Sequence, residues 1–264
     1  MADSTETRKE QRAAARAERA RAEAARARTR RRLWQLGGAL GVAAIVVIGI
    51  VLATSGGSSN KPKLRAGETL PGQIESNARF AGIPQKGIDL GDPKAPVTMV
   101  EFADLQCPFC QEYTTTVFPT LVADYVKTGK VRMEFRNVSI LGTDSVRAAQ
   151  MAGAAGLQNK LWPFIDVFYA NQGEEKTGYV TDDFLRKVGS AVNGLDVTKA
   201  MNERGIASVQ KQLDTAQSLM TENGFQGTPS FLIGRTGGTL SPLTVNAFQI
   251  DQFTKPIDKL LGKT

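Results

Sequence analysis

The chain contains two cysteines, Cys107 and Cys110, and only Pro108 and Phe109 lie between them. The residues before this motif predict a strand and those after it predict a helix, so Cys107 is expected at a strand-to-helix junction. The free N–H groups and positive dipole end of a helix start favour a thiolate, which is the nucleophile of disulfide exchange. Cys110, one turn further on, can attack a mixed disulfide at Cys107. Pro108 suits the first helical turn because its missing N–H is not needed there.

A Cys-x-x-Cys motif can also be a structural zinc site, a structural disulfide or a coincidence. A zinc site needs about four ligands, and the chain of 264 residues has no histidine and no third cysteine. The absence of histidine also excludes Cys–His and Ser–His nucleophilic pairs. A structural disulfide is possible, but so short a loop should stabilise the fold less than the roughly 3 kcal/mol of a 15-residue loop. Coincidence is disfavoured because every cysteine of the chain falls at one junction, so the motif predicts a redox site that needs no metal or cofactor.

The elements that must position the cysteines predict the start of a parallel sheet. Residues 97–102 are mostly apolar and β-branched, as expected of a strand buried on both faces. A loop with Cys107 follows, then a helix expected over about 110–127 and ended by Gly129. Residues 131–135 predict a second strand. Strand–helix–strand in this order is the unit of a parallel α/β sheet.

A helical block, about 143–223, is expected between this unit and the remaining strands. The expected helices cover residues 144–157, 160–170, 181–192 and 206–220. Strand signals return at residues 230–233. A hairpin turn is predicted at Gly237-Gly238, followed by a closing helix over 248–261 that contains Pro256.

Two segments resemble a known family. Residues 95–110, APVTMVEFADLQCPFC, resemble the active-site strand and loop of bacterial DsbA-like proteins of the thioredoxin superfamily. Residues 227–231, Gly-Thr-Pro-Ser-Phe, are similar to the cis-proline loop that faces the cysteines in that family. The resemblance covers about residues 83–262 and implies an α/β, thioredoxin-like fold with an inserted helical block. It also implies that Thr228-Pro229 is a cis peptide whose backbone pairs with the substrate chain; without the resemblance, Pro229 is more simply an ordinary loop proline.

Two further residues could tune the cysteines. Glu101 is a carboxylate inside an apolar strand, six residues before Cys107. It is either a strand-end residue paired to a Lys or Arg, or a buried acid that relays a proton to or from Cys110; an acid at this position in the family supports the second. Phe109 departs from the Cys-Pro-His-Cys of the best-known strongly oxidising DsbA, and it supplies no partner charge. The fold alone does not fix the direction of exchange.

The N-terminal part predicts a membrane anchor. Residues 33–54 are almost entirely apolar and are uncharged, and a helix of about 17–25 such residues spans a bilayer core. A cleavable signal peptide is the alternative, because Val51-Leu52-Ala53 resembles a small-residue cleavage site; an apolar core of about 7–15 residues is usual for such a signal. Arg30, Arg31 and Arg32 precede the span and place the N-terminus in the cytoplasm.

Formal charge separates the tail from the rest of the chain. Residues 1–32 contain eleven Lys or Arg and five Asp or Glu, which gives +6 of the total +7. The remainder is nearly neutral and gives no sign of nucleic-acid binding. The tail either sets topology as a solvated segment or is also attracted to anionic lipid. Residues 55–88 are expected to be an extracytoplasmic linker and lead-in, broken by prolines and glycines, and residues 89–264 the redox domain.

The resulting hypothesis is a single-pass membrane oxidoreductase. It would introduce disulfides into exported proteins that carry cysteine thiols, through Cys107 and Cys110. The resemblance implies reoxidation by a quinone-linked membrane protein of the DsbB or VKOR type. Two alternatives stay open: a reductase or disulfide isomerase on the same fold, and a membrane-tethered binding or chaperone domain whose disulfide is only structural.

Overall fold

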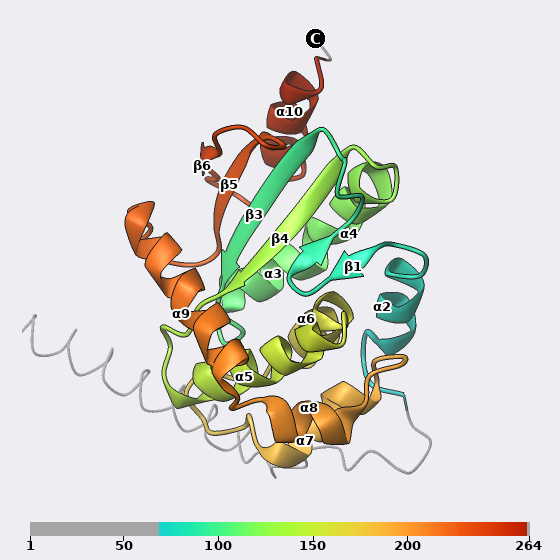
Figure 1. Cartoon of the computed structure of the whole chain (residues 1–264), viewed down its shortest axis with the longest axis vertical. Helices are drawn as coiled ribbons and strands as arrows, with labels where there is room; N and C mark the ends of the chain where they lie inside the picture. The colour runs from blue at the N-terminus through green and yellow to red at the C-terminus, as the bar shows by residue number, and fades with distance from the viewer. Residues whose placement is uncertain (1–68, 263–264) are drawn as a thin grey trace, which may run out of the picture. The chain divides into compact units, whose positions relative to one another are not determined.

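The computed structural model describes residues 69–262, and a six-stranded mixed sheet forms their centre (Figure 1). The spatial strand order is β1-β2-β4-β3-β5-β6. The strands are β1 (Gln85–Lys86), β2 (Asp89–Leu90), β3 (Val97–Ala103), β4 (Val131–Asn137), β5 (Ser230–Arg235) and β6 (Ser241–Leu243). The predicted α/β, thioredoxin-like architecture is confirmed for this part of the chain.

Strand β3 is the central element that leads into the cysteine motif. It runs parallel to β4 and antiparallel to β5, and all seven of its residues are buried. Its side chains alternate between two hydrophobic clusters: Met99 and Ala103 face the larger one, and Val100 and Phe102 face the smaller one. Burial on both faces explains why this stretch of sequence is almost continuously apolar.

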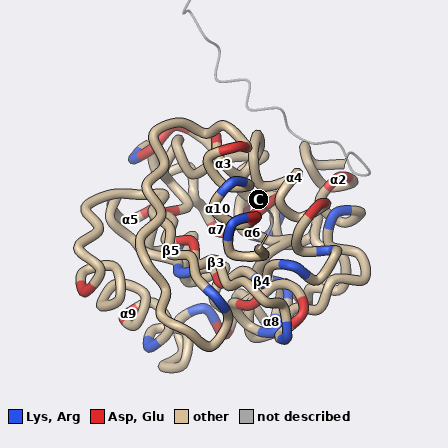
Figure 2. Tube along the Cα trace, turned by 90° about the horizontal axis from the view of Figure 1, so that it is seen from above, with Lys and Arg blue, Asp and Glu red and all other residues tan. Residues whose placement is uncertain are grey.

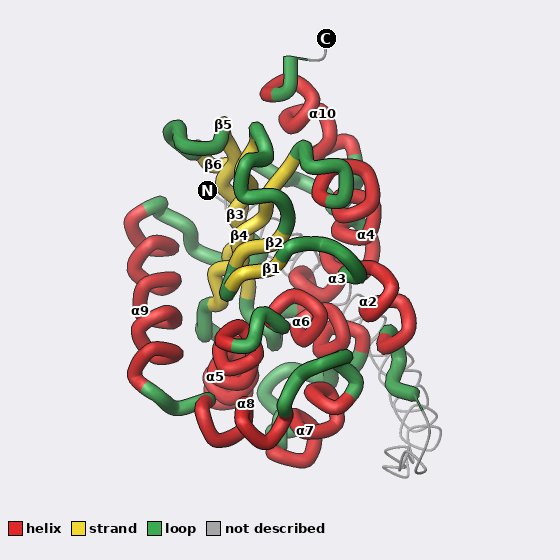
Figure 3. The backbone as a smooth tube through the Cα atoms, turned by 45° about the vertical axis from the view of Figure 1, so that its right-hand side comes forward, coloured by secondary structure: helices red, strands yellow, loops and turns green. Residues whose placement is uncertain are grey.

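Helices cover both faces of the sheet (Figures 1 and 3). The elements on the larger-cluster side include α3 (Pro108–Thr116), α4 (Phe118–Leu121), the π-helical turn η1 (Val122–Val126) and α10 (Asp251–Leu260). Tyr113 of α3 packs against Phe231 of β5 and Phe253 of α10, with ring centroids 4.8 Å and 5.2 Å apart. On the opposite face, Ala216 and Met220 of α9 (Ala207–Glu222) pack in the smaller cluster.

The predicted helical insertion lies between β4 and β5 and is confirmed. It comprises α5 (Thr143–Leu157), α6 (Leu161–Ala170), α7 (Asp182–Ser190), α8 (Val197–Glu203) and α9. Helices α5 to α8 gather beyond one end of the sheet, and α9 returns the chain along it (Figure 3). The preceding helix α2 (Gln73–Arg79) also packs on this block, through an ion pair between Arg79 and Asp166. The insertion therefore adjoins the end of β3 from which the cysteine loop leaves.

The prediction of one continuous helix over about residues 110–127 is wrong. The helical segment begins earlier, at Pro108, and is divided into α3, α4 and η1. Pro119 explains the division, because a proline inside a helix has no N–H to donate and crowds the preceding turn. The closing helix begins at Asp251 rather than near residue 248. Helix α8 was not separately predicted.

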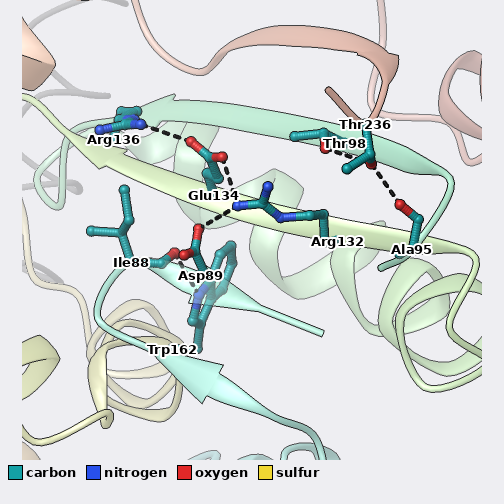
Figure 4. Close-up of polar contacts among 9 residues, drawn as sticks. All are labelled: Ile88, Asp89, Ala95, Thr98, Arg132, Glu134, Arg136, Trp162 and Thr236. Carbon is teal, nitrogen blue, oxygen red and sulfur yellow. Dashed lines mark hydrogen bonds and ion pairs between the residues drawn. The ribbon is translucent and has the colours of Figure 1, made fainter. Parts of the chain in front are cut away.

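A ladder of charged and polar contacts ties the edge strands to the sheet (Figure 4). Arg132 of β4 forms ion pairs with Asp89 of β2 at 2.9 Å and with Glu134 at 2.8 Å. The indole N–H of Trp162 donates to the carbonyl of Ile88 at 3.0 Å, which fastens the β2 region to α6. Acidic and basic residues are interspersed along the trace of this part of the chain (Figure 2).

The predicted anchor, residues 33–54, and the basic tail, residues 1–32, lie outside the described residues. Within residues 69–262, no helix has the length and apolar character needed to cross a membrane. The structured part begins before residue 89, since α2 and β1 belong to the same packed unit.

Candidate active site

Cys107 lies at the helix start that the sequence predicts. It is the N-cap residue of α3, with an extended backbone (φ −74°, ψ 121°), and Pro108 occupies the first helical turn. The backbone N–H of Cys107 is held by the carbonyl of Asp104 at 2.9 Å, so a tight turn joins β3 to the helix. Its side chain is largely buried, with 4% exposed, whereas the neighbouring Phe109 is 60% exposed.

The surroundings of Cys107 stabilise its thiolate. Its pKa is lowered from 9.0 to about 6, chiefly by a hydrogen bond from the Cys110 thiol, against the opposing effect of burial. Hydrogen bonds from Thr228 and from the backbone N–H groups of Cys110 and Phe109 add to the lowering. A thiol with this pKa is mostly ionised at neutral pH, so Cys107 can act as a nucleophile.

Cys110 lies in the opposite environment. Its side chain is completely buried, and both cysteines are free thiols in this structure. Burial raises the pKa of Cys110 well above its usual value, and the nearby charges of Cys107 and Glu101 raise it further. Cys110 is therefore a protonated thiol while Cys107 is a thiolate, and the two side chains differ in both access and charge.

The proline loop faces the cysteines across the fold. The Thr228-Pro229 peptide is cis, as the family resemblance implied. The Cys107 thiol lies 3.2 Å from the carbonyl oxygen of Thr228 and donates to it when protonated. Residues 121 positions apart in the sequence thus meet at one sulfur.

Glu101 lies in the middle of β3, with 2% of its side chain exposed. Burial raises its pKa from 4.5 to about 8. Its Oε1 atom has no hydrogen-bond partner, and it forms no ion pair with any Lys or Arg within residues 69–262. Within residues 69–262, Glu101 is therefore not paired to a base, and its burial favours the protonated form.

The loop between β3 and α3 is held by Asp104, a residue that was not among the predicted site residues. The carboxylate of Asp104 accepts from the backbone N–H groups of Gln106 at 2.8 Å, Ile140 at 2.8 Å and Leu141 at 3.0 Å. An Asp directly after a buried strand is a detectable signal for such a loop anchor.

Two residues of the insertion also hold the loop. Gln172, just beyond α6, donates to the carbonyls of Leu105 at 2.8 Å and Cys107 at 3.2 Å. The hydroxyl of Tyr169 donates to the carbonyl of Asp104 at 3.2 Å. No local pattern in the sequence marks these two residues, because their role depends on how the insertion docks. Within the described residues, no three His, Cys, Asp or Glu side chains lie close enough to hold a metal ion.

A sheet of this topology with a thiol pair at the β3–α3 junction and a facing cis-proline loop defines a thiol–disulfide oxidoreductase of thioredoxin-like fold. The comparisons with known proteins agree. Residues 84–251 match the profile of a family described as Thioredoxin, which is more than half of the chain, and the chain belongs to that family.

Curated relatives and solved structures refine the likeness. The chain is 32% identical over 239 residues to the probable disulfide bond formation protein D of Bacillus cereus, covering 88% of this chain and 98% of that one. A thioredoxin-like oxidoreductase from Silicibacter pomeroyi is 29% identical, with a TM-score of 0.53 over 72% of this chain and 98% of that one. Oxidised BdbD of Bacillus subtilis shares the fold, with a TM-score of 0.59 at 22% identity over 68% and 97% of the two chains. The protein is accordingly a DsbA-like thiol–disulfide oxidoreductase.

Proposed function

We propose that this oxidoreductase is an extracytoplasmic oxidase that donates a Cys107–Cys110 disulfide to exported proteins. The observation that carries the direction is the pKa of Cys107, lowered to about 6. The thiolate exists only in the reduced enzyme, so an environment that stabilises it makes the disulfide a stronger oxidant. The name of the Bacillus cereus relative, a probable disulfide bond formation protein, supports the same direction.

The exchange proceeds in two steps with distinct roles for the two sulfurs. A substrate thiolate attacks Cys107 Sγ, the enzyme disulfide breaks, and Cys110 leaves as a thiolate that takes a proton from Glu101. A second substrate thiolate then attacks the substrate sulfur of the mixed disulfide and releases Cys107 as a stabilised thiolate. Cys107 is assigned this role because it caps the start of α3 and has a lowered pKa, whereas Cys110 is completely buried and has a raised pKa.

Substrate binding is assigned to the loop that faces the cysteines. The backbone of Thr228-Pro229 would pair with the extended substrate chain, since the Thr228 carbonyl lies beside Cys107 Sγ. Pro108 and Phe109 set the start of α3 and the exposed surface next to the reacting sulfur. Phe109 offers an apolar contact to an unfolded substrate chain.

The cellular arrangement is the second part of the proposal. Residues 1–32 are a cytoplasmic tail and 33–54 a lipid-embedded anchor, and a linker joins the anchor to the redox domain, whose structured part includes α2 and β1. Reduced enzyme requires an electron acceptor, and a quinone-linked DsbB- or VKOR-type membrane protein fits that need. The family resemblance supports this partner class.

Single-cysteine variants test the roles of the sulfurs. Cys110→Ala should accumulate mixed disulfides with substrates through Cys107, because the escape attack of Cys110 is gone. Cys107→Ala is the matched variant and should accumulate none, since Cys110 is buried. Mixed disulfides formed by Cys107→Ala instead would reverse the assignment.

A reductase or isomerase is the rival, because Phe109 supplies no charge to favour the thiolate. Alkylation trapping in intact cells distinguishes the two. A mostly oxidised Cys107–Cys110 pair supports the oxidase, and a mostly reduced pair supports the rival. Full activity of Cys107→Ser would instead favour a binding or chaperone domain.

A further inference from the structure

Gln106, the residue directly before Cys107, has a buried side chain with no part in the exchange steps. It is 1% exposed, and its Nε2 atom donates to the hydroxyl of Tyr179 at 2.8 Å. Its Oε1 atom is buried without a hydrogen-bond partner in the described part of the chain. A buried amide with so few partners is costly, because it has given up its hydration. The contact with Tyr179 therefore decides how the Gln106 side chain is held.

Tyr179 reaches this amide from the segment between α6 and α7. Its ring packs against Phe184 and Phe168, with centroids 5.0 Å and 6.4 Å apart. Gly173 lies against the same ring, and a Cβ at that position would be only 2.9 Å from it. Burial raises the pKa of Tyr179 to about 12, so its hydroxyl is uncharged at neutral pH. The ring is fixed by its neighbours, and the hydroxyl is a neutral acceptor at a fixed place.

The two ends of this segment contact the same stretch of the active-site loop. Gln172 donates to the carbonyls of Leu105 and Cys107, and Tyr179 holds the side chain of the residue between them. The segment thus holds three consecutive residues of the loop. Because Gln106 and Cys107 share a peptide bond, the direction in which the Cys107 side chain leaves the backbone depends on how Gln106 is held.

That direction matters because the Cys107 sulfur depends on several partners at once. Hydrogen bonds from the Cys110 thiol and from the backbone N–H groups of Cys110 and Phe109 stabilise its thiolate. Hydrogen bonds weaken steeply when their distance and angle depart from the preferred values. A small rotation of the peptide between Gln106 and Cys107 would therefore weaken several bonds to the sulfur together.

We propose that Tyr179 is a positioning residue of the redox site: its hydroxyl holds the Gln106 side chain and thereby fixes the backbone that directs Cys107 Sγ at the start of α3. The inference rests on the proposed role of Cys107 as the attacked sulfur. Tyr179 acts only through Gln106 and takes no part in proton or electron transfer. The helical insertion thus affects the redox chemistry through one phenol hydroxyl.

Tyr179→Phe removes this hydroxyl and keeps the ring. Tyr125→Phe is the matched control, since the hydroxyl of Tyr125 contacts Asp258 of α10 at 3.1 Å rather than the active-site loop. In Tyr179→Phe the acid dissociation constant of Cys107 should fall about three- to tenfold. The equilibrium constant for oxidising glutathione should fall by up to that factor, because the thiolate exists only in the reduced enzyme. Tyr125→Phe should leave both constants unchanged.

Titration of thiolate absorbance and equilibration against glutathione measure the two constants, and urea unfolding of each reduced variant measures its stability. A purely structural role would lower the free energy of unfolding of Tyr179→Phe and leave both constants at their wild-type values, which would overturn the proposal. Equal shifts of the constants in Tyr125→Phe would also contradict it, because the effect would then not depend on the contact with Gln106.

Gln106→Leu tests whether Tyr179 acts through the amide. It replaces the amide by an apolar group of similar size, so no unpaired polar group of residue 106 stays buried, and it should fold even if Tyr179→Phe does not. Its two constants should shift in the same direction as those of Tyr179→Phe. Adding Tyr179→Phe to Gln106→Leu should bring no further shift. Wild-type constants in Gln106→Leu, or shifts that add in the double variant, would overturn the route through Gln106.

The same measurements separate this inference from the proposed direction of exchange. If the wild-type thiols are mostly reduced in intact cells and Tyr179→Phe still shifts both constants, the positioning role stands and the oxidase proposal fails. If the thiols are mostly oxidised in cells and the constants of Tyr179→Phe equal those of the wild type, the oxidase stands and the positioning role fails.

Discussion

At the residue scale, two identical side chains acquire opposite properties from positions three residues apart. Cys107 caps the start of α3 and gains hydrogen bonds that favour a thiolate, with a pKa of about 6. Cys110 is enclosed by the protein interior, which raises the pKa of its thiol well above the usual value. The asymmetry follows from burial and helix geometry, and it makes one sulfur the site of attack and the other the leaving group.

Phe109 is the position at which the stability of the Cys107 thiolate, and with it the reduction potential, can be changed. A histidine there would place a partly protonated imidazole beside the helix start, and a cation favours the Cys107 thiolate. We expect Phe109→His to lower the Cys107 pKa and to raise the reduction potential by about 30 mV for each tenfold change in the equilibrium. Because Phe109 is 60% exposed, the change should cost little folding stability.

Equilibration against glutathione and titration of thiolate absorbance measure both quantities for Phe109→His. Phe109→Leu, which stays neutral, is the matched control and should leave both close to the wild-type values. A potential that does not rise in Phe109→His would mean that the cis-proline loop or Glu101 sets the redox balance.

The buried acid Glu101 should make folding stability depend on pH. Below about pH 4.5 the carboxyl is protonated in both folded and unfolded chains, whereas between about 4.5 and about 8 only the folded chain keeps the proton. Stability is therefore lost as pH rises through this window. We expect the free energy of unfolding of Glu101→Gln to rise relative to that of the wild type by up to about 1.4 kcal/mol for each pH unit in this window.

Urea unfolding of the reduced protein at several pH values measures this difference. Glu112→Gln changes an exposed carboxylate on α3 and should give a curve parallel to the wild type. A constant difference between wild type and Glu101→Gln across the window would contradict a proton held by Glu101 in the folded chain.

At the element scale, the insertion does more than cover the sheet, because it holds the active-site loop. Gln172 donates to two carbonyls of that loop, one of them on Cys107. We expect Gln172→Leu to leave these carbonyls unpaired and to destabilise the fold by about 1–3 kcal/mol. The Cys107 pKa should also shift, because the start of α3 is no longer fixed.

Gln158→Leu is the matched control for Gln172→Leu. Its amide also donates to a backbone carbonyl, that of Asp196 at 3.0 Å, but in an exposed contact outside the site. Urea unfolding and thiolate absorbance of both variants check the prediction. If both variants lost the same stability and the Cys107 pKa were unchanged, Gln172 would not be fixing the active-site loop.

The same elements show what the sequence could reveal. The apolar run of β3, the glycine after the helix and the proline next to Cys107 are local signals, and they correctly predicted the junction that positions the thiol. The cis-proline loop was found only through family resemblance, since nothing in the sequence around Thr228-Pro229 indicates that this pair faces Cys107. Gln172 and Tyr169 could not be predicted, because their contacts depend on docking between elements far apart in the chain.

At the scale of the whole molecule, the redox domain is proposed to reach its substrates through a membrane anchor. Charge predicts the orientation: Arg30, Arg31 and Arg32 directly precede the apolar span, whereas the first basic residues beyond it, Lys61, Lys63 and Arg65, are more distant. We expect protease added to spheroplasts to remove a tag at residue 264 while leaving a tag at residue 1 intact. Cleavage should begin near residue 60, in the predicted linker.

Exchanging the three arginines for glutamine tests the cause of that orientation. The triple variant should show a mixed population, because the charge asymmetry across residues 33–54 is reduced. It should also lose oxidised Cys107–Cys110 in proportion to the domain retained in the cytoplasm, where thiols are kept reduced. Immunoblots of both tags before and after lysis measure the two populations. Protection of the C-terminal tag in the unmodified protein would place the thiols in a reducing compartment, and the oxidase proposal would then fail together with the anchor orientation.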